Sequence, residues 1–175
     1  MHIALYKPDI PQNTAAIIRL SSCLDLKLHI VEPCGFNLND SRFKRVVMDY
    51  IGFSKIFRYE DYDVFFKKNS KSRIILMTTK AKKSYLKFKF KKNDILLFGR
   101  ESAGVPKILH KTIKNKLKVP INKKTRSLNV AMTVAIVAAE ALRQNNFLKS
   151  EFIIILSNYF VLKLLQQQSQ LSLQH

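Results

Sequence analysis

Short apolar runs alternate along the chain with segments in which apolar residues recur at helical spacing. The runs that predict strands cover residues 2–7, 26–33, 72–79, 94–99 and 117–121. The helical patterns begin near Asn13, Asp40, Asp61, Pro106 and Asn129, which are residue types favoured or tolerated at helix starts. This alternation predicts an α/β fold with a mostly parallel sheet and helices on both faces. Ligands of such sheets bind beyond the carboxyl ends of the strands.

The segment 125–144 starts with polar residues and becomes apolar almost all the way round. Arg126 and Ser127 precede Asn129, the expected N-cap, and a helix N-terminus with such neighbours can hold an anionic or polar ligand. One side of the helix carries Val130, Val134, Val137, Ala138 and Ala141, and the opposite side carries Met132, Ala135, Ala139 and Leu142. A helix that is buried on both sides predicts a subunit partner, and the alternative is cover from the chain's own C-terminal segment.

The length and the charge balance narrow the class of protein. A chain of 175 residues favours one domain with a substantial core. Lys and Arg total 31 against 12 Asp and Glu, which gives a formal net charge of +19. Such an excess is typical of a nucleic-acid partner. The competing interpretation is a genome rich in A and T, which favours lysine codons everywhere.

Several classes of protein are disfavoured by what the chain contains. Two cysteines without a CxxC motif and four scattered histidines give neither a disulfide scaffold nor a metal site. The N-terminus has no signal-peptide pattern, and the apolar run 152–165 is interrupted and short of a membrane span. We therefore expect a cytoplasmic protein without a bound metal or a membrane anchor.

We divide the chain into one domain, residues 1–147, and an extension, residues 148–175. No internal repeat is visible, and the character of the sequence changes after Gln144. The extension is apolar at first and then rich in glutamine, so it is expected to be an appended helix that frays into a polar tail.

The segment 96–106 combines two glycines with an acid at the end of a predicted strand. Gly99 and Gly104 have the spacing of a Walker A loop, but Val105 and Pro106 follow them, which disfavours a nucleoside triphosphatase. Gly99 would let the backbone approach a ligand, and Glu101 would place a carboxylate beside it. The alternative is an ordinary strand-to-helix turn with a capping glutamate.

A basic segment covers residues 80–92 and holds seven lysines. Its lysines at 87, 89 and 91 alternate with phenylalanines, which in an extended chain points the rings to one face and the ammonium groups to the other. We expect the rings in the core and the lysines either in solvent or on RNA phosphates. Arg42, Lys44 and Arg45 form a second basic group, for which an RNA face and a solvated helix are equally compatible.

Three ordered motifs, "PQNTAAIIRLSS", "LLFGRESAGVP" and "TRSLNVAMTVAIVAAEALRQ", resemble the SpoU-type branch of the SPOUT methyltransferases. "HIALYKPDIPQNTAAIIRL" and "LHIVEPCGF" are most similar to its small single-domain subgroup, which 2′-O-methylates the wobble nucleotide of tRNA. The resemblance covers about residues 1–144. It implies an α/β fold with a C-terminal deep trefoil knot, bound S-adenosylmethionine, a tRNA substrate and a homodimer.

The resemblance also implies roles for individual residues. The catalytic group comprises Asn13, Arg19, Glu101, Ser127 and Asn129. The cofactor-binding group comprises Met77, Thr78, Gly99, Val119, Ser127 and Leu128. The RNA-binding group comprises Arg19, Arg42, Arg45, Lys80, Lys82 and Arg126.

Methylation of a ribose hydroxyl requires in-line alignment with the methyl group and removal of a proton. Our leading hypothesis is that Arg19, beside a substrate phosphate, stabilises the developing alkoxide, because arginine is nearly always protonated. Glu101 is the alternative as a general base. Ala15 replaces a frequent family glycine and is expected to crowd the first motif's turn, and the 130–133 run loses polar side chains. The alternatives for function are methylation of another RNA, such as rRNA, and an RNA-binding protein that has lost catalysis.

Overall fold

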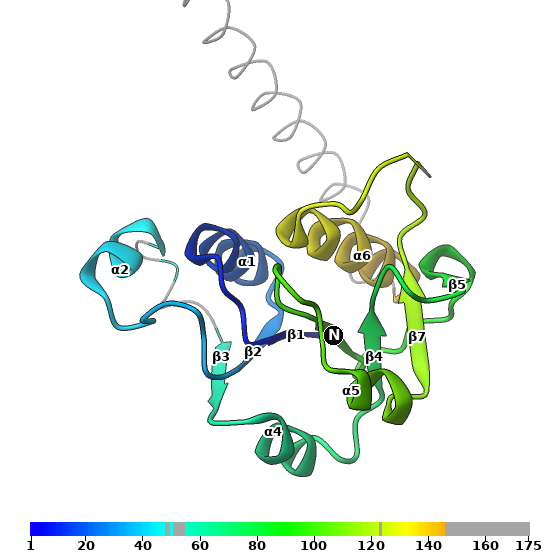
Figure 1. Cartoon of the computed structure of the whole chain (residues 1–175), viewed down its shortest axis with the longest axis horizontal. Helices are drawn as coiled ribbons and strands as arrows, with labels where there is room; N and C mark the ends of the chain where they lie inside the picture. Colours follow the sequence, from blue (N-terminus) through cyan, green and yellow to red (C-terminus); the bar gives the residue numbers. More distant parts are fainter. Residues whose placement is uncertain (48–49, 51–54, 123, 146–175) are drawn as a thin grey trace, which may run out of the picture.

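The computed structural model describes residues 1–47, 50, 55–122 and 124–145 (Figure 1). The expected extension, residues 148–175, lies outside the described residues. Seven strands form one parallel sheet in the order β3-β2-β1-β6-β4-β7-β5. The strands are β1 (His2–Tyr6), β2 (Lys27–Val31), β3 (Lys55–Tyr59), β4 (Ile74–Met77), β5 (Lys83–Ser84), β6 (Ile95–Phe98) and β7 (Asn115–Lys118). This confirms the predicted α/β class.

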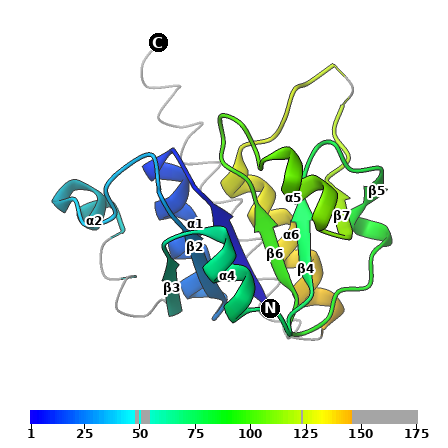
Figure 2. The same cartoon turned by 60° about the horizontal axis from the view of Figure 1, so that its bottom comes forward.

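Helices cover both faces of the sheet (Figures 1 and 2). One face carries α1 (Pro11–Cys23), α2 (Ser41–Val47) and α6 (Val130–Gln144), with α1 packed between the other two. The other face carries α4 (Tyr62–Lys68) and α5 (Lys107–Thr112). A short 3-10 helix, η1 (Tyr85–Lys87), follows β5.

The alternation of side chains along buried strands divides the core into two clusters. In β1, Ile3 and Leu5 face the cluster beneath α1 and α6, whereas Ala4 and Tyr6 face the cluster beneath α4 and α5. β6 repeats the pattern and is buried along its whole length. Strands buried on both faces read as continuous apolar runs, which is why β1, β4 and β6 were predictable from the sequence.

Two strands were not predicted, and a third is displaced. β3 lies at one edge of the sheet, and its solvent-facing Lys55, Phe57 and Arg58 hide the strand pattern. β5 is a two-residue edge strand within the basic segment. β7 begins two residues before the predicted start at 117 and ends before Pro120. Edge strands are short or charged in native sheets, so their hydrophobic signal is weak.

The start of α1 also differs from the prediction. Pro11 occupies the first turn, and Ile10 is the N-cap without a capping side chain. Asn13 lies inside the helix, so the prediction that it caps α1 was wrong. Proline explains the earlier start, because it has no N–H to satisfy in the first turn. Ala15 is buried within α1 and not in a turn, so the expected crowding of a turn was also wrong.

The faces of α6 are less symmetrical than the sequence indicates. Leu142 is buried together with the predicted inner stripe except Val130, which is half-buried. On the outer face of α6, Met132 is 43% exposed, Ala139 is exposed and Ala135 is half-buried. The trefoil knot and the subunit partner stay predictions.

Candidate active site

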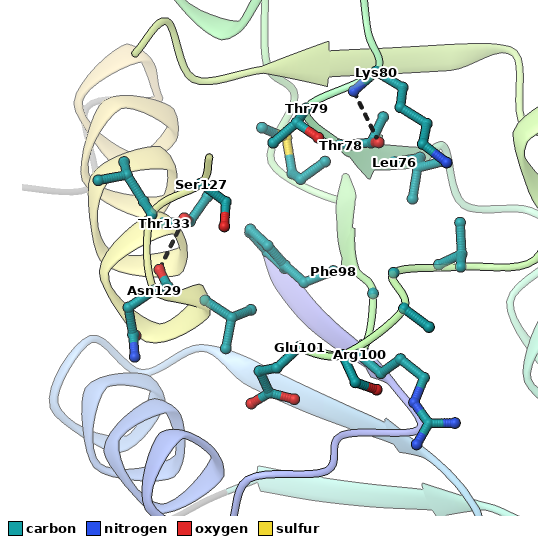
Figure 3. A pocket seen from close by; sticks show the side chains of 18 of the residues that line it. Leu76, Thr78, Thr79, Lys80, Phe98, Arg100, Glu101, Ser127, Asn129 and Thr133 are labelled. Carbon is teal, nitrogen blue, oxygen red and sulfur yellow. Dashed lines mark hydrogen bonds between the residues drawn. The ribbon is translucent and has the colours of Figure 1, made fainter. Parts of the chain in front are cut away.

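A cavity of about 500 Å³ opens at the carboxyl ends of the central strands. Its walls come from the ends of β4 and β6, the segments after β6 and β7, and the start of α6, as Figure 3 shows. The apolar part of the wall includes Leu76, Met77, Phe98, Val119 and Ile121. Polar groups from α1, the loop after β6 and the start of α6 complete it. This is the position in which parallel α/β sheets bind ligands.

A chain of hydrogen bonds joins three segments that are far apart in the sequence. Asn13 Nδ2 donates to Glu101 Oε1 at 2.9 Å, and Asn129 Nδ2 donates to Asn13 Oδ1 at 2.8 Å. We call Glu101, Asn13 and Asn129 the amide relay. Each of the three sequence motifs contributes one member to it.

The relay ends at the N-terminus of α6. Asn129 Oδ1 accepts hydrogen bonds from the backbone N–H groups of Ala131 at 2.8 Å and Met132 at 3.3 Å. Asn129 is thus the predicted N-cap, and its remaining amide group is the one that contacts α1. The N-terminus of α6 holds the side-chain carbonyl oxygen of Asn129, and Glu101 can only accept from the Asn13 amide. These two contacts determine the orientation of both asparagine amides.

The loop after β6 is closed upon itself. Arg100 and Gly104 exchange two backbone hydrogen bonds, at 2.8 and 3.1 Å. A Cβ on Gly99 would lie 2.5 Å from the carbonyl carbon of Gly104, and Gly104 has a φ of +69°. Both glycines are needed to close the loop, so the tight contact at Gly99 comes from the loop's own backbone and not from an approaching ligand.

Asp9 attaches this loop to the start of α1. Its carboxylate accepts from the Glu101 N–H at 3.1 Å, from Arg100 Nε at 3.1 Å and from the Ser102 hydroxyl. In return, the Asp9 N–H donates to Glu101 Oε2 at 3.1 Å. We call these residues, Asp9 and 100–102, the loop clasp. Glu101 therefore acts neither as a helix cap for α5 nor as a free carboxylate, because both of its oxygens accept hydrogen bonds.

The clasp changes the ionisation of Asp9. Burial acts to raise the pKa of this carboxyl, but the hydrogen bonds that involve Ser102, Glu101 and Arg100, together with the Arg100 charge, outweigh it. The net result is a pKa below the usual value for aspartate. Asp9 is consequently a carboxylate that holds the loop at neutral pH.

All six residues of the expected cofactor group line the cavity, as do four of the five expected catalytic residues. In Figure 3, the Glu101 carboxylate points toward the start of α6, and the Arg100 side chain points the opposite way. Arg19 is the exception. It does not line this cavity, and its guanidinium lies 5.0 Å from the centre of the Tyr50 ring.

The expected RNA-binding residues are dispersed over the surface. Lys80 lines the active-site cavity, and Arg42 lines a second cavity between α1 and α2. Arg45, Lys82 and Arg126 are exposed and line neither. In the basic segment, Phe88 and Phe90 are buried while the lysines at 87, 89 and 91 are exposed, as the alternation predicted.

Some lining residues were not singled out from the sequence. Ile10, Thr133 and His110 line the cavity, and the pKa of His110 is lowered by burial and by the charges of Lys80 and Lys116. Thr133 occupies the run that was expected to lose polar side chains, and its hydroxyl donates to the Asn129 carbonyl at 2.9 Å. The sequence signal that could have identified Thr133 is its position four residues after the N-cap, from which a threonine hydroxyl can reach the carbonyl of residue i−4.

Two further observations concern metals and membranes. No group of three His, Cys, Asp or Glu side chains in the described ranges is placed to hold a metal ion. Over the same residues, no helix has the length and apolar character that crossing a membrane requires.

The chain matches the model of the SpoU rRNA Methylase family over residues 1–139. It is 42% identical over 144 residues to a tRNA (cytidine(34)-2′-O)-methyltransferase of Ancylobacter novellus, across 81% of this chain and 91% of that protein. It is 35% identical over 146 residues to the protein of the same name in Escherichia coli K12, across 82% and 93%. The chain therefore belongs to the SpoU methylase family.

Solved structures agree with this assignment. One described as "Structural insights into the 2-OH methylation of C/U34 on tRNA" superposes with a TM-score of 0.79 at 32% identity, covering 83% of this chain and 95% of that one. An AdoMet-bound rRNA methyltransferase from Sinorhizobium meliloti has the same fold, with a TM-score of 0.72 at 22% identity, covering 81% and 55%.

Proposed function

We propose that this protein transfers a methyl group from S-adenosylmethionine to the ribose 2′-hydroxyl of the wobble nucleotide, a cytidine or modified uridine, in tRNA. The observation that carries the proposal is the amide relay at the rim of a cavity formed by all three methyltransferase motifs. The names of the relatives, which are 35–42% identical over nearly their whole length, supply the substrate.

The cavity has the shape and the chemistry that this cofactor needs. Its volume of about 500 Å³ falls within the range of cofactor sites. Leu76, Phe98 and Val119 form an apolar slot suited to an adenine ring, and Thr78 and Ser127 offer hydroxyl groups beside it. The expected cofactor group, namely Met77, Thr78, Gly99, Val119, Ser127 and Leu128, would hold the molecule. When bound, S-adenosylmethionine supplies a methyl group on a positively charged sulfur.

The amide relay would position the ribose. Asn13 and Asn129 hold each other in one orientation, and Glu101 fixes that orientation from the far end. A rigid polar rim next to the cavity can align a hydroxyl with little loss of entropy during the reaction. In this arrangement, Glu101 acts mainly by orienting Asn13, because one of its oxygens accepts from the Asn13 amide and the other from the Asp9 N–H.

Arg19 would act on the RNA and not on the cofactor. It lies on α1 away from the cavity, against the Tyr50 ring. A guanidinium there can pair with a phosphate of the bound RNA, and through that phosphate it can stabilise negative charge on the reacting oxygen. If Arg19→Ala retains near-normal single-turnover methyl transfer, this role is wrong.

We further propose that the enzyme works in the cytoplasm as a homodimer. Ile10, Leu128 and Met132, near the cavity, are 40%, 42% and 43% exposed. Apolar side chains gathered at one site favour burial against a second subunit. A formal charge of +19 suits an anticodon arm that contacts both subunits. Sedimentation of the full chain tests the dimer.

The test of function is methyl transfer from labelled S-adenosylmethionine to tRNA that lacks 2′-O-methylation, followed by nucleoside mapping. We expect label on the 2′-oxygen of the wobble nucleotide. If label appears on rRNA in a parallel reaction and not on tRNA, the substrate is a different RNA and the chemistry is the same. Absence of both methylation and cofactor binding would indicate an RNA-binding protein on an enzyme scaffold.

A further inference from the structure

A second cavity, of about 390 Å³, lies between the first turn of α1 and helix α2. Its apolar wall includes Phe36 and Phe43, whose ring centres are 5.0 Å apart, and Val46, which is 50% exposed. The aromatic pair and the exposed aliphatic side chain beside it form an apolar surface that is accessible from solvent. Flat aromatic ligands suit such a surface.

The rim of this cavity can form hydrogen bonds. Gln12, Asn37, Asp40 and Arg42 line it. In the described part of the chain, the Gln12 side chain has no hydrogen-bond partner, and the Asn37 amide uses only its oxygen, which accepts from the Asn39 N–H. An apolar floor with free amide groups at its edge matches the face and the edge of a nucleobase.

Charge determines which part of an RNA fits here. The Asp40 carboxylate at the cavity pairs with Arg42 at 3.4 Å, so a phosphate there would compete with it for that cation, whereas an exocyclic amine of a base can donate to its oxygens. Arg42 is 88% exposed, and Lys44 and Arg45 follow it along α2. Phosphates would therefore lie outside on these cations while a base enters the cavity.

The second cavity shares a wall with the active site. Ile10 and Asn13 line the active-site cavity, whereas Pro11 and Gln12, on the other side of the same turn, line the second one. One helical turn measures about 5.4 Å along its axis, so the two cavities are near enough for adjacent nucleotides of one strand.

Resting on the proposed function, we propose that the second cavity binds the base of a nucleotide adjacent to the one that is methylated. Its floor stacks against the base, and Gln12 and Asn37 contact its edge. The site would thus contribute to substrate choice outside the catalytic cavity.

The test combines changes in the protein with removal of a base from the RNA. The full-length protein methylates a synthetic anticodon stem-loop in which either neighbour of the wobble nucleotide is intact or abasic. For the unmodified protein, we expect one abasic position to lower kcat/KM by about tenfold, the effect of losing one base stack. With Val46→Glu, the intact RNA should already show that loss, and the abasic site should add none.

Phe66→Glu is the matched control, because Phe66 is 52% exposed on α4 on the other face of the sheet. Gln12→Ala is a milder second variant that covers the case in which Val46→Glu fails to fold. If the variant and the abasic site each lower kcat/KM and the two factors multiply when they are combined, the base does not occupy the cavity. A change in self-association with multiplied losses would make it a subunit contact instead.

This outcome is separable from the proposed function. Methylation of the wobble nucleotide by the unmodified protein tests that function alone. If no RNA is methylated, the affinity for the same stem-loops, measured with the same variants, still decides whether the base and the cavity interact.

Discussion

Two chains of polar side chains, similar in length, occupy opposite environments in this protein. The amide relay lies at the open rim of the active-site cavity. The second, which we call the histidine chain, consists of His2, His29 and Tyr59 beneath α4. His2 Nδ1 and His29 Nε2 are 3.0 Å apart, and His29 Nδ1 and the Tyr59 hydroxyl are 2.8 Å apart. Both chains join segments that are distant in sequence.

The histidine chain and the amide relay differ in how deeply they are buried, and this difference determines what each can do. His29 is 3% exposed and stacks on its histidine neighbour and on Phe57. Burial lowers the pKa of both histidines to about 4, with smaller contributions from nearby positive charges. Both histidines are thus neutral at pH 7, and both ring nitrogens of His29 have polar partners within the core. All three members of the relay, in contrast, line a cavity that can admit a ligand. Hydrogen bonding of similar quality therefore supports structure in one place and chemistry in the other.

Breaking the amide relay should give the largest effect on activity. Glu101→Gln can place an amide donor against the donor of Asn13, so the two asparagines lose their fixed orientation. We expect single-turnover methyl transfer to fall by about 100-fold, the usual cost of misplacing a reacting group, with little change in Tm. Glu60→Gln, on an exposed residue, is the matched control. Full activity in Glu101→Gln would exclude the orienting role.

Loosening the loop clasp should have an intermediate effect. Asp9→Asn replaces an acceptor oxygen that serves Arg100, Ser102 or the Glu101 N–H. Methyl transfer should fall by about tenfold, because the loop shifts without removal of any relay member. Rates measured at several cofactor concentrations check this, with exposed Asp63→Asn as the control. An unchanged rate would show that the loop holds its place without Asp9.

The histidine chain should affect stability and not activity. Because the folded pKa values are about 4 and the usual value is 6.5, the unfolded chain binds more protons between these pH values. Stability is therefore complete above pH 6.5 and falls as the pH decreases toward 4. His29→Phe should lose about 1 kcal/mol at pH 7.5, because the Tyr59 hydroxyl loses its 2.8 Å contact with the ring and keeps only the Asn69 amide at 3.4 Å. The variant should also show a shallower decrease in acid. Thermal unfolding from pH 4 to pH 8 measures both. A parallel decrease in the two proteins would contradict the assignment.

The smallest effect should come from a single surface cation. Lys82→Ala removes one exposed charge from the basic segment. Phosphate contacts add affinity without sequence information, so tRNA binding should weaken a few-fold and its salt dependence should decrease by about one counterion. Titrations at several salt concentrations test this against Lys67→Ala, which lies on exposed α4. Equal slopes for the two variants would place Lys82 outside the RNA face.

The parts of the fold that the sequence predicts are those with local signals. β1, β4 and β6 are continuous apolar runs, and Asp61 and Asn129 cap α4 and α6 as predicted, because caps depend on neighbouring backbone groups. The cofactor group followed from the resemblance of motifs, and all of its members line one cavity. Edge strand β3 was missed because its exposed side chains carry no alternating pattern.

Contacts between distant residues needed the tertiary structure. Asp9 was not singled out, since an aspartate before a proline-rich helix start looks ordinary, and its partners lie more than 90 positions away. The same applies to the histidine chain, whose members come from three strands. The sequence by itself determined the class of fold, the three motifs and the positive charge. Only the folded sheet decided which polar groups meet, because a hydrogen bond depends on position within tenths of an ångström and on burial.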